Sequence, residues 1–267
     1  MKVQVIPSKG LGDALIFHMA TMQLRERGIE AKTESHWLEK LDAWIDPTSV
    51  GSIDSPDAVI LQHDNSEAAS KMGSGQFRFY GSHQAHKHGP LSPRDFVARR
   101  HLCMVDNVTL ALSEWFQAPF QCVFTTSRNV VRHNRRVAIH PSSSASHKNW
   151  PESHFHAVAD ALRQEQCDVI WLTHGGQNLN ELADILASCS LFIGNDSGPG
   201  HLASALGTPT LIVGPEYSHM QLWRPGWSPG HVICPPRWAT FFRWGRKNWQ
   251  QFITKSMVIS FLKRNYI

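Results

Sequence analysis

The stretch Leu191–Pro215 constrains the fold of this 267-residue chain more than any other. It reads LFIGNDSGPGHLASALGTPTLIVGP, in which two short apolar runs enclose a glycine-rich turn and a short helical segment. The runs Leu191–Gly194 and Thr210–Val213 have the length and branching of buried strands, and His201–Leu206 reads as a helix. In a parallel sheet, such a helix points free backbone N–H groups into the crevice at the strands' carboxyl ends, where they can hold a phosphate. The alternative is an ordinary βα connection.

Composition sets only broad bounds. Hydrophobic residues make up 42% of the chain and charged ones 18%, as in an ordinary globular protein. The net charge of +4 suits an acidic ligand or an anionic membrane surface, but it is too small to predict nucleic-acid binding. Five widely spaced cysteines without a CxxC pair fit a reducing compartment and argue against structural zinc. The polar N-terminus and the lack of a run of about 18 apolar residues predict a cytoplasmic protein.

The first strand, Val3–Ile6, leads through a turn containing Gly10 and Gly12 into a helical pattern that begins at Asp13. An acidic residue at a helix start is favoured by the helix dipole, which is the plain interpretation. A carboxylate at the carboxyl end of a first strand also faces a ligand crevice, where it could remove a proton from a hydroxyl nucleophile.

Two polar segments follow in the first half. Residues 82–95 contain His83, His86 and His88 without an acidic partner, which favours a solvated loop over a metal site. Arg94, Arg99 and Arg100 flank Phe96-Val97 at the start of a helix expected to reach Trp115. They are either a solvated face or a cationic patch that binds phosphates or acidic sugars.

A polar segment from about Gln117 to Asn134 reads as an interdomain linker. The strand Arg136–His140 then leads into the serine-rich turn Pro141–Pro151. Its hydroxyls, its backbone amides and Lys148 could together surround a diphosphate. The alternative is a flexible loop whose serines bond only their own backbone.

These three turns, in this order, resemble glycosyltransferase family 9, the lipopolysaccharide heptosyltransferases. The resemblance rests on the Gly-Asp that ends at Asp13, on HPSS and KNWP within His140–Pro151, and on NDSGPGH within Asn195–His201. It implies an α/β fold of the GT-B type, two Rossmann-like domains facing across a cleft. The domains are expected at 1–117 on the acceptor side and 135–249 on the donor side, joined by a linker at 118–134, with a helix at 250–267 that packs back on the first domain.

The resemblance also implies a function, an inverting transfer of a sugar, heptose by expectation, to a lipopolysaccharide core or related glycan. The donor would be a nucleoside-diphosphate sugar, ADP-heptose by expectation, with no cofactor and no metal, and Asp13 would be the general base. Gly10, Gly12 and the three arginines would bind the glycolipid or glycan acceptor. The residues expected to bind the donor are Ser142, Ser143, Lys148, Asp196, Ser197, Gly198, Pro199, Gly200 and His201.

Two features depart from the family pattern. Only residues 174–178 separate the strand at Val169–Thr173 from the helix at Leu179–Cys189, where the family has a further acidic loop, helix and strand. This shortening keeps open a second hypothesis, a non-catalytic nucleotide- or sugar-binding protein. A dinucleotide-dependent oxidoreductase is disfavoured because no G-x-G-x-x-G opens a helix. The aromatic and basic segment 241–249 suits either packing or a peripheral membrane contact.

Overall fold

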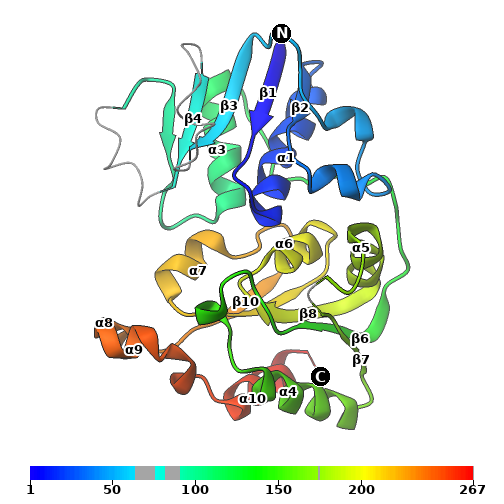
Figure 1. The fold of residues 1–267 in the computed structure, drawn as a ribbon, viewed down its shortest axis with the longest axis vertical. Coiled ribbons are helices and arrows are strands. Elements are labelled where there is room, and N and C mark those ends of the chain that lie inside the picture. Colours follow the sequence, from blue (N-terminus) through cyan, green and yellow to red (C-terminus); the bar gives the residue numbers. More distant parts are fainter. Residues whose placement is uncertain (64–75, 82–90, 174, 267) are drawn as a thin grey trace. The chain divides into compact units, whose positions relative to one another are not determined.

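The chain folds into two compact units, residues 1–128 and 129–267, in a computed structural model. The structure describes residues 1–63, 76–81, 91–173 and 175–266. Figure 1 shows that each unit is built on a twisted sheet with helices beside it. The division between the units falls within the segment 118–134 that the sequence suggests as a linker.

The first unit has a five-stranded parallel sheet in the order β2-β1-β3-β4-β5. Its elements are β1 (Lys2–Ile6), α1 (Leu11–Arg25), β2 (Glu30–Thr33), β3 (Ala58–His63), β4 (Gln76–Tyr80), β5 (Asp95–Val97) and α3 (Met104–Phe116), with short 3₁₀ turns at Leu38–Leu41 and Pro47–Ser49. Helices α1 and α3 pack on each other. The strand residues Val3, Val5 and Ile60 are fully buried in the core of this unit.

The second unit repeats the design with the order β10-β9-β8-β6-β7, again all parallel. Its strands are β6 (His133–His140), β7 (Asp168–Trp171), β8 (Cys189–Asn195), β9 (Thr210–Val213) and β10 (Gly230–Ile233). Its helices are α4 (Glu152–Gln164), α5 (Leu179–Ser188), α6 (Gly198–Ala205), α7 (Tyr217–Trp223), α8 (Arg237–Phe241), α9 (Arg243–Lys247) and α10 (Lys255–Asn265), with 3₁₀ turns at Ser146–Lys148 and Trp249–Phe252.

Both sheets reverse their strand order at one point, between β1 and β3 in the first unit and between β6 and β8 in the second. In open parallel sheets the connections on either side of such a point run to opposite faces, which leaves a crevice at the carboxyl ends of the two strands. Ligands bind at this place in doubly wound folds. The topology therefore marks one candidate site in each unit.

The sheet of the second unit is covered on both faces. Alternate strand residues, including Val137, Ile139 and Leu191, form a core with Trp150 and with the buried side chains of α4 and α10. Phe192 and Ile212 alternate with these residues, and both approach Gly200 of α6. A β-carbon at Gly200 would lie 3.1 Å from Ile212 Cδ1, so glycine allows α6 to lie close against the sheet.

The C-terminal helix α10 packs against α4 within the second unit. Its buried residues Val258 and Leu262 belong to the core formed with α4, and Lys263 forms an ion pair with Glu165 just after α4. Trp150 Nε1 donates a 2.8 Å hydrogen bond to the carbonyl oxygen of Ile253, just before the helix. Val258 and Leu262 of α10 thus belong to the core of their own unit.

Two elements differ from what the sequence predicts. Residues Asp95–Val97 form the edge strand β5 rather than a helix start, because their backbone pairs with β4, and the helix begins only at Met104. The segment Glu216–Gly230, which contains Pro225 and Pro229, reads as a loop in the sequence, but its residues Tyr217–Trp223 form α7. The buried side chains of Met220 and Leu222 hold this short helix in place.

Candidate functional site

The candidate donor site is built by the two loops that follow β6 and β8, on either side of the reversal in strand order. Asn195, fully buried at the end of β8, joins them with its side-chain amide. Its Oδ1 accepts a 2.9 Å hydrogen bond from the backbone N–H of Trp150, and its Nδ2 donates to the carbonyl oxygen of Pro141. One side chain therefore fixes both ends of the serine-rich turn against the glycine-rich turn.

Three charged or titratable side chains meet at this place. Lys148 Nζ lies 3.2 Å from Asp196 Oδ2, and His219 Nε2 lies 3.1 Å from the same oxygen. Only 10% of the Asp196 side chain is exposed. Burial by itself raises the pKa of Asp196, but the hydrogen bond from His219 and the charge of Lys148 outweigh it and hold the pKa at about 2. Asp196 is therefore ionised at neutral pH, and it holds the two donors in place.

The N-terminus of α6 lies directly after this carboxylate. Ser197 is the N-cap residue with an extended backbone, and its side chain makes no cap hydrogen bond. Gly198 therefore presents its N–H at the helix start, whereas Pro199 has none and the N–H of Gly200 bonds the carbonyl oxygen of Ser197 at 3.1 Å. His201 is buried, and its Nδ1 atom has no hydrogen-bond partner in the described structure. Burial lowers the pKa of His201, while the nearby Asp196 raises it, with a net lowering. Backbone N–H groups and a neutral imidazole thus stand at the end of a helix dipole.

The two predicted serines behave differently from each other. Ser142 Oγ lies 3.4 Å from Nε2 of His140, and Ser197 Oγ lies 3.5 Å from Nδ1 of the same ring. Ser143 Oγ instead lies 2.6 Å from Oδ1 of Asn149 and 3.0 Å from the carbonyl oxygen of Ala145, and its single hydroxyl proton can be donated to either acceptor. Ser143 therefore shapes its own turn, as the alternative interpretation of the sequence allows.

In the first unit, Asp13 lies in the first turn of α1, which follows β1. Gln62, near the end of β3, donates a 2.5 Å hydrogen bond from Nε2 to Asp13 Oδ1. Its Oε1 accepts a 2.9 Å bond from the backbone N–H of Ser8, which fixes the orientation of the amide group. Gly10, the N-cap residue, has no room for a side chain, because a β-carbon there would lie 2.6 Å from Asp13 Oδ2. The carboxylate therefore has a defined orientation at the reversal between β1 and β3.

The residues predicted to bind the sugar acceptor lie in separate parts of this unit. Gly12 lies in the first turn of α1 beside Asp13. Arg94 stacks over the ring of Phe77, and Arg99 pairs with Glu114 at 2.8 Å on the surface. Arg99 and the exposed Arg100 follow β5 and so lie at the same carboxyl edge of the sheet as Asp13. They are three strands away, about 14 Å at the usual spacing.

The sequence analysis assigns no role to two polar side chains at these sites, Gln62 and His219. Gln62 is a polar residue near the end of the otherwise apolar strand AVILQH, a signal that the sequence does contain. His219 lies on α7, and a segment interpreted as a loop offered no reason to single it out.

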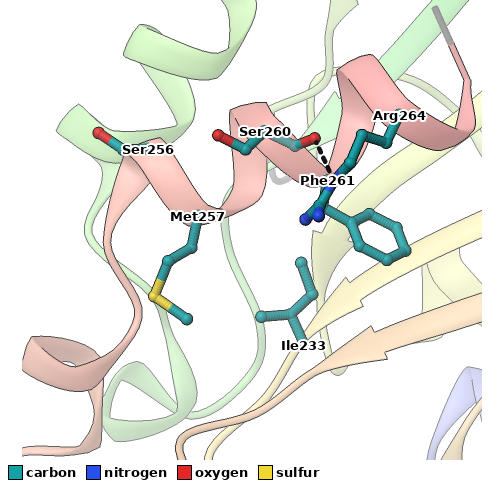
Figure 2. Close-up of a pocket in the computed structure, with 6 residues that line it drawn as sticks. All are labelled: Ile233, Ser256, Met257, Ser260, Phe261 and Arg264. Carbon is teal, nitrogen blue, oxygen red and sulfur yellow. Dashed lines mark hydrogen bonds between the residues drawn. The ribbon is translucent and has the colours of Figure 1, made fainter.

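The remaining candidates are the histidine-rich segment and a hollow beside α10. Residues His83, His86 and His88 lie outside the described residues. Within the described parts of the chain, no three His, Cys, Asp or Glu side chains gather as a metal site would require. A hollow of about 440 Å³ lies beside α10, where Figure 2 shows Met257 and Phe261 directed toward Ile233 of β10. Its lining is mostly apolar and contains neither of the two turns.

Comparisons with known proteins match part of this chain to one family. The model of glycosyltransferase family 9 (heptosyltransferase) matches residues 107–178 and 174–234. The two matches meet at 174–178, the short connection between β7 and α5. Lipopolysaccharide heptosyltransferase 3 of Escherichia coli is 30% identical over 133 residues, which span 40% of this chain and 37% of that protein.

Solved structures cover nearly the whole chain. E. coli heptosyltransferase WaaC with ADP aligns with 99% of this chain and 100% of its own at a TM-score of 0.69 and 15% identity. E. coli ADP-heptose lps heptosyltransferase II aligns at 0.67 and 16% identity, over 99% and 98%. The dodecameric iron-containing heptosyltransferase TibC aligns at 0.60 and 13%, over 98% of this chain and 75% of its own. These likenesses show the GT-B fold, and the sequence matches to the family model and to heptosyltransferase 3 show that the chain belongs to glycosyltransferase family 9.

Proposed function

We propose that this protein is an inverting glycosyltransferase that moves a sugar, heptose by preference, from a nucleoside-diphosphate sugar to a lipopolysaccharide core or related glycan. One observation supports this most strongly. In the second unit, Lys148, His219 and the start of α6 converge on one place at the β6–β8 reversal. Such a set of cationic and N–H groups suits a diphosphate.

The donor is proposed to bind with its diphosphate against the first N–H groups of α6. WaaC, the solved heptosyltransferase with ADP, has also been solved with ADP-2-deoxy-2-fluoro heptose, which makes ADP-heptose the donor to test first. Asp196 would not contact the diphosphate, because two anions repel each other. Its role in the proposal is to hold Lys148 and His219, which both contact its Oδ2.

In the transfer itself, Asp13 takes the proton of an acceptor hydroxyl while that oxygen attacks the anomeric carbon of the donor. The bond between this carbon and the diphosphate oxygen breaks, and the nucleoside diphosphate leaves with the electron pair. Configuration at the anomeric carbon inverts in this single displacement. Lys148 and the α6 dipole stabilise the charge that builds on the leaving group, so we propose that the reaction needs no metal ion.

The first experiment is a calorimetric titration of the chelator-treated protein with nucleoside diphosphates and nucleotide sugars, ADP-heptose included, followed by a transfer assay. We expect one donor to bind and to be turned over, with Lys148→Ala weakening its binding. Asp13→Asn should abolish transfer with the donor affinity unchanged. Transfer by Asp13→Asn at the normal rate would refute the assignment of the base, and loss of transfer on chelation would refute the metal-free mechanism.

A second candidate is a non-catalytic nucleotide- or sugar-binding protein. The direct passage from β7 to α5 favours it, because the family has a further acidic loop, helix and strand there, and the resemblance implies that a glutamate of this unit holds the ribose of the donor. The same titration separates the two, since donor binding with no transfer to a panel of lipopolysaccharide-core acceptors would support this candidate.

A further inference from the structure

The C-terminal segment of the sequence contains basic residues but no acidic ones, unlike the rest of the chain. All 22 acidic residues lie at or before Glu216, together with 18 of the 26 basic residues. The following 51 residues contain the other eight basic residues and no acidic one. The small net charge of the whole chain therefore hides a strongly basic C-terminal segment on an acidic remainder.

Four large aromatic side chains of this segment are exposed on the short helices α8 and α9. The exposed fractions are 68% for Trp238, 75% for Phe241, 68% for Phe242 and 60% for Trp244. Arg237, Arg243, Arg246 and Lys247 alternate with them and are exposed as well. We call these eight residues the aromatic–basic patch. Figure 1 shows that α8 and α9 stand at one end of the second unit, away from the strands of its sheet.

The patch is held rigidly, so its exposure is not that of a frayed chain end. Helices α8 and α9 pack together through the buried Ala239 and Gly245, and a β-carbon at Gly245 would overlap the carbonyl oxygen of Ala239. The rings of Trp238 and Trp244 both meet Phe252 edge-on, with centroids 5.6 and 6.1 Å apart. Packing contacts therefore hold these apolar rings in positions where solvent reaches them. In a globular protein, a cluster of exposed apolar side chains marks an interaction surface.

We infer that the aromatic–basic patch binds the surface of an anionic lipid bilayer. Tryptophan and phenylalanine interleaved with Arg and Lys suit the boundary between headgroups and acyl chains. Among the described residues no helix is long and apolar enough to cross a membrane, so the contact would lie in the interface. A nucleic acid fits less well, because Phe241 and Phe242 meet at 85° and leave no row of parallel ring faces for successive bases.

The inference is tested by flotation of the full chain with vesicles, in a binding assay that does not depend on glycosyl transfer. We expect binding to vesicles of phosphatidylcholine and phosphatidylglycerol at a two-to-one ratio, weaker binding in high salt and little binding to phosphatidylcholine alone. The variant Arg243→Gln/Arg246→Gln should lower the partition coefficient about 30-fold. The variant Phe241→Ser/Phe242→Ser should lower it at least about tenfold.

Matched controls come from exposed residues elsewhere in the second unit. Val131→Ser removes an apolar side chain that is 79% exposed, and Arg163→Gln removes a surface charge, and neither should change binding. Circular dichroism should show all variants folded, since the substituted side chains are exposed. A blue shift of tryptophan emission on vesicle binding should disappear in Trp238→Phe/Trp244→Phe.

Three results would overturn the inference. The first is equal vesicle binding by the wild type and the Phe241→Ser/Phe242→Ser variant. The second is binding to a single-stranded oligonucleotide in place of vesicles. The third is a concentration-dependent dimer in sedimentation velocity that this variant abolishes and that excludes vesicles, because the patch would then contact a second copy of the chain.

Discussion

Asp13 and Asp196 are two aspartates with different neighbours, one in each unit. Asp13 follows the first strand, faces a reversal in strand order and is oriented by a glutamine amide. Asp196 follows a strand at the other reversal but accepts bonds from Lys148 and His219. We propose the first as a proton acceptor, whereas the second is a counter-charge, and the difference comes from their neighbours alone.

Gln62 provides the sharpest residue-level prediction. Gln62→Leu removes the donor that holds Asp13 and leaves the Ser8 N–H without its acceptor. We expect kcat to fall about 10- to 100-fold, equivalent to one hydrogen bond to a charged group, while the donor Kd stays unchanged. Steady-state kinetics together with calorimetry measure both quantities.

The matched control is Gln4→Leu. Gln4 is a buried glutamine on the neighbouring strand β1, and its side chain bonds only backbone groups of Lys32, Gly51 and Ile53. This variant should lose stability but retain kcat. An equal loss of kcat in both variants would mean that Gln62 acts only through the fold.

His219 can be tested in the second unit. His219→Leu deprives Asp196 of one of its two partners, so the carboxylate is less well neutralised and repels a diphosphate. We expect the Kd for the nucleoside diphosphate to rise about tenfold. The control is His231→Leu, because the His231 ring bonds the hydroxyl of Tyr266 and is not part of the proposed donor site. Unchanged affinity in His219→Leu would remove His219 from the proposed donor site.

At the scale of elements, helix α1 contains a buried histidine whose titration is linked to folding. His18 bonds Thr33 of β2 through Nδ1 at 2.9 Å, and burial, aided by Arg25 and opposed by Asp46, lowers its pKa to about 4. In the unfolded chain, His18 is protonated below about pH 6.5, whereas in the folded chain it stays neutral down to about pH 4. The free energy of unfolding should therefore fall by about 3 kcal/mol as the pH drops through this window.

Urea unfolding at pH 7 and pH 4.5 measures this dependence. His18→Gln should be less stable at pH 7, because packing is lost, but should show a shallower fall with pH. His154 and His201, whose pKa values burial also lowers, titrate in both proteins and cancel in the comparison. An unchanged pH dependence in His18→Gln would show that another group carries it.

The elements also show what the sequence could and could not predict. The run Thr210–Val213 forms β9 as its pattern predicts, and the short helix of the glycine-rich turn is present but begins at Gly198, earlier than the predicted His201. Both were predictable because hydrophobic periodicity and turn residues act locally. Strand β5 was missed because three residues become a strand only by pairing with β4. Helix α7 was missed because Pro225 and Pro229 nearby outweighed two buried side chains. The contact of Lys148 with Asp196 joins loops 48 positions apart, and only the adjacency of β6 and β8 brings them together.

At the scale of the whole molecule, two units with separate cores should respond separately to a ligand. A nucleoside diphosphate at about 100 times its Kd stabilises the unit that binds it by about 2.7 kcal/mol. Scanning calorimetry with ADP should therefore raise the transition of the second unit by about 10 °C. The transition temperature of the first unit should not change, and Lys148→Ala should abolish the shift of the second unit. A shift of both transitions by the same amount would contradict independent units.

The direct passage from β7 to α5 has a consequence for selectivity. Discrimination between nucleotides is a difference of affinities, and it needs side chains that meet the parts in which the nucleotides differ. The groups that converge at α6 are proposed to bind the diphosphate, which every nucleoside diphosphate shares. A chain without the extra unit beside β7 would therefore tell donors apart by their sugar more than by their base. Among family members, it would be a permissive starting point for altering donor choice.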